Sequence, residues 1–116
     1  MEKVRIKDKG HLESLFKQYA ENEGMTFYPN MIVEGNSGLE FQDLVETCEV
    51  IGYENLLFES DFAENPKGHC DTFYIDLIGI KGFRFGLGIE SISFFGGKIP
   101  DELHFENDGT LRVWFD

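Results

Sequence analysis

The residues whose types and spacing could do chemistry lie near the C-terminus, where acids alternate with a histidine. On an extended strand, alternate side chains point to the same face, so Glu102, His104 and Glu106 share one face. Leu103 and Phe105 are then expected to face the core. Carboxylates and an imidazole can together bind a divalent metal. Because no fourth ligand lies at a defined spacing, we predict an ordinary solvated strand face and no metal, although the pattern leaves a metal open.

Two further groups suggest catalysis only weakly. His69, Cys70 and Asp71 would combine a thiol with a local base, but neighbours on a strand point in different directions, so Cys70 and His69 are poorly placed to pair. Asp76 lies inside an apolar run and is the acid that we most expect to be buried. A structural hydrogen-bond acceptor is nevertheless the more common fate of such a residue. We therefore predict no catalytic residue, no cofactor and no enzymatic activity.

Composition indicates one water-soluble domain spanning residues 1–116. Hydrophobic residues make up 41% of the 116 residues and aromatic residues 15%, which suffices for a core without cross-links. No apolar run approaches the roughly 20 residues that cross a bilayer, and the N-terminus lacks the apolar region of a secretory signal. Cys48 and Cys70 are too few for a disulfide framework. We expect a cytoplasmic protein that does not bind membranes.

The first half of the chain has helical periodicity. Apolar residues recur at helical spacing from Lys9 to Glu23, with Asp8 placed to cap the start and Gly24 the end. Residues 25–34 are then expected to be extended, before a turn at residues 35–38.

A second helix is predicted to extend to about Val50. Ser37 and Glu40 have the spacing of a capping box, and the following apolar residues occupy one side of a helical wheel. A strand remains an alternative for residues 38–51, because Thr47, Val50 and Ile51 favour one.

Beyond Gly52 the pattern favours strands. Asn107-Asp108-Gly109 is a strong hairpin signal. The expected strands are 55–62, 72–80, 83–94 with a bulge near Glu90-Ser91, 102–106 and 110–115, with a turn at Lys81-Gly82. This order predicts an α+β fold, a mostly antiparallel meander sheet with one or two helices packed on one face.

Charge is the strongest functional signal. The formal net charge is −12, and residues 18–66 hold eleven acids without a single Lys or Arg. Unpaired acids attract cationic partners and repel nucleic acid, which counts against direct binding of a phosphate backbone. The first nine residues carry four bases and two acids and are able to pair with the acidic body.

The base-free acidic segment, the lack of a catalytic motif and the β-rich C-terminal half resemble the small acidic α+β immunity proteins that bacteria make alongside secreted or contact-delivered toxins. The resemblance implies tight one-to-one binding to a basic toxin domain, often a nuclease. Acids on the outer face of the second helix would steer association, and an aromatic would anchor the complex. The expected partner-binding residues are Glu40, Asp43, Glu46, Glu49, Glu59, Asp61 and Trp114.

Two alternatives stay open at this point. One is a phage-type nucleic-acid mimic that inhibits a host nuclease or DNA-binding protein. The other is a small metal- or carboxylate-dependent enzyme centred on Glu102, His104 and Glu106 or on Asp76.

Overall fold

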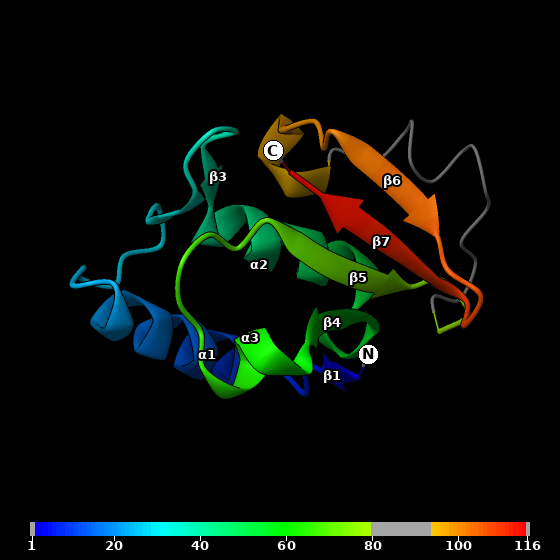
Figure 1. Ribbon diagram of the computed structural model, residues 1–116, viewed down its shortest axis with the longest axis horizontal. Coiled ribbons are helices and arrows are strands. Elements are labelled where there is room, and N and C mark those ends of the chain that lie inside the picture. Colours follow the sequence, from blue (N-terminus) through cyan, green and yellow to red (C-terminus); the bar gives the residue numbers. More distant parts are fainter. Residues whose placement is uncertain (1, 80–93, 116) are drawn as a thin grey trace.

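A computed structural model describes residues 2–79 and 94–115 as an α+β fold, as the sequence predicts (Figure 1). Five strands form one sheet in the order β1-β4-β5-β7-β6, in which every pairing is antiparallel, and β2 and β3 form a separate two-stranded sheet. The elements are β1 (Lys3–Arg5), α1 (Lys9–Asn22), β2 (Ile32–Glu34), β3 (Leu39–Glu40), α2 (Phe41–Ile51), η1 (Tyr53–Asn55), β4 (Leu56–Glu59), α3 (Ser60–Glu64), β5 (Thr72–Asp76), η2 (Phe94–Gly97), β6 (Glu102–Phe105) and β7 (Thr110–Trp114).

Helix α1 begins where the sequence predicts. The Asp8 carboxylate accepts a hydrogen bond of 2.8 Å from the backbone N–H of His11, which satisfies one free donor of the first turn. Its apolar stripe enters the core through Leu12, Leu15, Phe16, Tyr19 and Ala20. The helix ends one residue earlier than expected, and Gly24 follows with a positive φ of 67°. Of the extended segment predicted at 25–34, only Ile32–Glu34 forms a strand.

Residues 41–51 form a helix, so the strand alternative is wrong. The predicted capping box is also wrong, because Leu39 and Glu40 pair with β2 and the helix begins only at Phe41. The box that forms joins Glu40 and Asp43: the Asp43 carboxylate accepts from the Glu40 N–H at 2.8 Å. The Ser37 hydroxyl instead donates to Glu34 at 2.6 Å.

The C-terminal hairpin is confirmed, since β6 and β7 pair across the turn at residues 107–109. Strand β5 ends at Asp76, four residues before the predicted end, because the Asp76 carboxylate accepts from the N–H groups of Ile78 and Gly79 and turns the chain. Strand β4 likewise ends at Glu59, where α3 begins. The predicted strand at 83–94, its bulge and the turn at Lys81-Gly82 lie outside the described residues.

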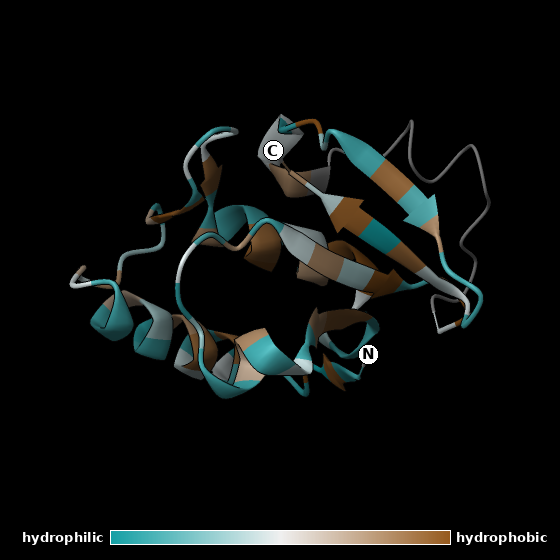
Figure 2. Cartoon of the chain, in the orientation of Figure 1, coloured by the Kyte–Doolittle hydropathy of each residue, from teal (hydrophilic) through white to brown (hydrophobic). Residues whose placement is uncertain are grey.

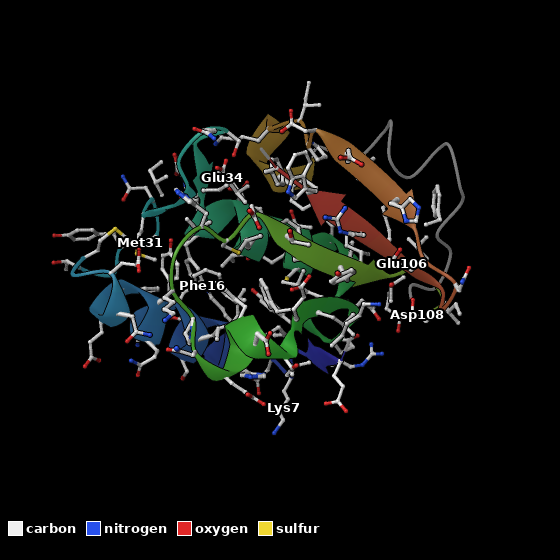
Figure 3. All side chains as sticks on the ribbon, in the orientation of Figure 1. Lys7, Phe16, Met31, Glu34, Glu106 and Asp108 are labelled. Atoms are coloured by element: carbon white, nitrogen blue, oxygen red, sulfur yellow. The ribbon has the colours of Figure 1, made fainter. Side chains whose placement is uncertain are left out.

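Alternate strand residues enter one hydrophobic core with the helices. Phe58, Phe73 and Phe115 are fully buried, whereas their strand neighbours face the opposite side of the sheet. Figure 2 shows this alternation as brown and pale bands along β5 and as brown and teal bands along β6 and β7. Phe16 lies between α1 and the sheet (Figure 3), with its ring 5.4 Å from that of Phe41 and 5.9 Å from that of Phe58. Within residues 2–79 and 94–115, no helix has the length and apolarity needed to cross a membrane.

Candidate functional site

The acid-rich segment does not form one continuous patch. Of its eleven acids, Glu34 and Asp43 are buried, and the other nine are half-buried or exposed on α1 and its C-cap, β3, α2, η1, β4 and α3. Five of the seven predicted partner-binding residues fall into two groups, and Asp43 and Trp114 belong to neither. We call Glu40, Glu46 and Glu49 the α2 surface, and Glu59 and Asp61 belong to a pocket beside α3.

The α2 surface agrees with the prediction for the outer face of the second helix. Glu46 and Glu49 are exposed, and Glu40 at the N-cap is half-buried with its carboxylate accepting from the Gln42 side chain at 2.8 Å. Lys98 lies near this surface, but its ammonium is 2.9 Å from Asp43. The hydrogen bond to Asp43, reinforced by the charges of Glu40 and Glu46, raises the pKa of Lys98. The α2 surface therefore keeps a surplus of negative charge.

The placement of Asp43 on the outer face is wrong, because only 3% of this residue is exposed. Its carboxylate accepts from Glu40, pairs with Lys98 and lies so close to η2 that a Cβ built on Gly96 would overlap it. Thr47 adds a second link, accepting from the backbone N–H of Phe95 at 2.9 Å. Asp43 is a structural acid because residues distant in sequence pack over it.

A pocket of about 380 Å³ lies between α3 and the segment leading into β5. Its charged lining comprises Glu59, Asp61, Lys67, His69 and Asp71, and Phe62 adds an aromatic wall. The Tyr74 hydroxyl donates to Glu59 at 3.0 Å, and burial together with this bond raises the pKa of Tyr74 to about 12. Sequence reasoning missed this pocket because α3 was predicted to be part of a strand.

Trp114 is half-buried on the face of the sheet away from the core, whereas its neighbour Phe115 is fully buried. The sheet therefore buries one residue of this aromatic pair and leaves the other partly accessible. Trp114 pairs with Thr72 of β5, and Thr72 lines the pocket. The structure thus brings the predicted anchor to the same end of the sheet as Glu59 and Asp61.

The cysteines are core residues. Cys70 is buried, and burial followed by the charges of Asp71 and Glu34 raises the pKa of its thiol. Burial likewise raises the pKa of Cys48 to about 12. A thiol with a raised pKa stays protonated near neutral pH and is a poor nucleophile. His69 is exposed.

The C-terminal acid and histidine pattern places two side chains together. The His104 Nδ1 is 2.8 Å from a Glu106 carboxylate oxygen, and Glu102 lies opposite Trp114. Among the described residues, no three His, Cys, Asp or Glu side chains are arranged to hold a metal ion.

The expectation that Leu103 and Phe105 are in the core is wrong, since they are 41% and 47% exposed. They do share the face of Val113 and Leu111, as the alternation predicts. Their strand, β6, is an edge strand of the five-stranded sheet and lies at the side away from α1 and α3 (Figure 1). The alternation therefore predicts the face of β6 on which these two side chains lie, but that face is not buried in β6.

Asp76 is half-buried and not the buried acid that we expected. It pairs with Arg5 at 2.9 Å and accepts two backbone N–H groups, so it is a structural acceptor. Among residues 2–79 and 94–115, the buried acids are Asp43 and Glu34. Burial alone would raise the pKa of Glu34, but hydrogen bonds from the hydroxyl and N–H of Ser37 and from the N–H of Asn36 hold it below its usual value.

Two of the four amino-terminal bases, Lys3 and Arg5, form ion pairs with acids of the C-terminal half and not with those of the acid-rich segment. Lys3 is 2.7 Å from Asp108 and 4.5 Å from the centre of the Tyr74 ring, and Arg5 pairs with Asp76. Lys3 and Glu59 are register partners, yet the lysine ammonium extends to Asp108. These bases therefore leave both the α2 surface and the pocket acids unneutralised.

Comparison of the chain with models of known families, with curated proteins and with solved structures found no match.

Proposed function

We propose that this acidic domain acts by binding a basic protein and blocking it. The observation that carries the proposal is the α2 surface, where Glu46 and Glu49 are exposed and the nearby Lys98 is already bound by Asp43. An uncompensated negative surface speeds encounter with a positively charged protein and disfavours phosphate-rich ligands. The net charge of −12 extends this field over the whole molecule.

Within this class, we propose an immunity protein that neutralises a basic toxin domain, such as a nuclease, in a one-to-one complex. The support is the resemblance in charge, size and fold type to such proteins. Direct blocking requires a complementary surface and no catalytic group of the inhibitor's own. Trp114, half-exposed at the end of the sheet, supplies an aromatic of the kind that anchors interfaces.

The test starts from a partner captured from the organism that encodes the chain and then measures its association kinetics. Glu46→Lys combined with Glu49→Lys should slow association on the order of tenfold at low ionic strength, because steering falls with the opposing charge. Glu21→Lys combined with Glu23→Lys makes the same change in net charge at the far end of α1 and is the matched control.

Equal rates for the two double variants would contradict the proposal, because net charge alone would then explain association. If the captured partner is a host nuclease or DNA-binding protein and not a toxin, the immunity function is wrong, but the proposal that the chain binds and blocks a basic protein stands. Circular dichroism of each variant checks that the fold is intact.

A further inference from the structure

The pocket beside α3 is separate from the α2 surface and differs from it in being a cavity with an aromatic wall. It has a volume of about 380 Å³, which lies in the range of small-ligand sites of roughly 300 to 1,000 Å³. We propose that it receives the guanidinium group of an arginine side chain presented by the partner. This inference rests on the proposed function, because it names the group by which a basic protein would be held.

The carboxylates of the pocket are held in place before any ligand arrives. Glu59 accepts from the hydroxyl of Tyr74, and Tyr74 is 2% exposed and therefore fixed by packing. Asp71 accepts from the Thr72 hydroxyl at 2.9 Å. Each of these bonds engages one carboxylate oxygen, so the other is available to a cationic donor. Asp61 adds a third, exposed carboxylate from the first turn of α3.

The balance of charge favours a cation over an anion. Three acids line the pocket against Lys67 and His69, and Lys3, which faces Glu59 in the sheet, is bound by Asp108. The acids are not arranged around one point as metal ligands. Carboxylates spread around a larger space match a cation with several donors, which is the character of a guanidinium.

The aromatic wall distinguishes arginine from lysine. Phe62 is half-buried, and its ring is held by Phe58, with a centroid distance of 5.5 Å, and by Phe16, at 6.0 Å. A planar guanidinium can stack on a fixed ring while donating at its edge to carboxylates, whereas a compact ammonium cannot do both.

The test is a nuclear magnetic resonance titration of the whole chain with the peptide acetyl-Gly-Arg-Gly-amide. We expect shifts at the backbone amides of residues 59–72 and a dissociation constant on the order of millimolar. The citrulline peptide, which has the same shape without the charge, should cause no saturable shift. The lysine peptide should bind at least about twofold more weakly.

Variants identify the groups that bind. Asp61→Asn should weaken arginine-peptide binding by about twofold to fivefold, and Asp61→Asn with Asp71→Asn by about tenfold. Lys67→Ala should strengthen binding, because it removes a competing cation. Glu49→Gln, which changes an exposed acid outside the pocket, is the matched control and should leave binding unchanged.

Saturable shifts with citrulline, equal binding of the lysine peptide, or weaker binding in Lys67→Ala would each overturn the inference, the last because it would indicate an anion site. The two proposals fail separately. If the pocket does not bind arginine but charge reversal on α2 still slows association, only the pocket assignment falls. If the peptide binds but reversal on α2 has no specific effect, the pocket assignment stands without the proposed steering surface.

Discussion

The outer face of the five-stranded sheet and the α2 surface both carry acidic residues, but ion pairs form on the sheet, whereas the exposed glutamates of α2 are unpaired within the described part of the chain. On the sheet, Lys3 pairs with Asp108 and Arg5 with Asp76, so each of these two bases neutralises one acid. On α2, Glu46 and Glu49 extend into solvent, and the cation near them is held by Asp43. The difference shows that topology, and not composition, decides which acids remain unpaired.

The pairing on the sheet follows from strand order. Strand β1 joins the edge of the sheet beside β4, which brings the basic amino-terminus to the acids of β5 and of the turn between β6 and β7 (Figure 1). Exposed ion pairs contribute little to stability, but they cancel the local field. If β1 paired with a different strand, Lys3 and Arg5 would neutralise acids on a different surface.

The largest effect on this comparison should come from replacing Asp43, the buried acid that pairs with Lys98. We expect Asp43→Ala to lower the free energy of unfolding by about 2 to 3 kcal/mol, because it removes the capping box and the ion pair that a buried carboxylate makes with Lys98. Urea denaturation measures the change. Glu46→Ala, on the same helix but exposed, should change it by less than about 0.5 kcal/mol. Equal losses would mean that Asp43 is not a structural acid.

The second buried acid gives a pH-dependent test. Hydrogen bonds lower the pKa of Glu34 in the folded state, so its ionised form stabilises the fold above the unfolded pKa of about 4.3, and this contribution is lost as the pH falls through the folded pKa. Glu34→Gln should therefore cost about 1 to 2 kcal/mol at pH 7. The difference from wild type in urea denaturation should shrink as the pH falls below about 4.3. A difference that is constant over this range would show that the charge of Glu34 is not involved.

The smallest effect should come from the paired face of the sheet. A double-mutant cycle with Arg5→Met and Asp76→Asn should give a coupling free energy below about 1 kcal/mol, because the arginine side chain is 49% exposed. Asparagine keeps an oxygen that can accept from the turn N–H groups. A coupling well above that value would make this ion pair a structural element and would weaken the contrast with α2.

Local signals predicted part of the fold correctly. Asp8 capped α1, and Asn107-Asp108-Gly109 formed the hairpin turn, because each depends on residues close in sequence. The second capping box was misplaced because β3 pairs with β2 before the helix begins, and that pairing has no signal in the residues around Ser37.

The candidate site was harder to predict because it depends on contacts between distant residues. Helical periodicity correctly predicts that Glu46 and Glu49 are exposed. It also predicts an exposed Asp43, which is wrong because Lys98 and η2, both far along the chain, cover this residue. The pocket depends on α3 and on the approach of residues 67–72, neither of which local patterns predict. Pairing of the amino-terminal bases likewise followed from strand order.

The central claim, that the unpaired acids of α2 recruit the partner, is tested most directly by the salt dependence of association. The rate constant for partner binding would be measured over a range of ionic strengths for wild type, for Glu46→Gln with Glu49→Gln, and for Arg5→Met with Asp76→Asn. We predict that neutralising α2 flattens the dependence and that neutralising the sheet pair leaves it unchanged. Equal slopes for the two double variants would contradict this account.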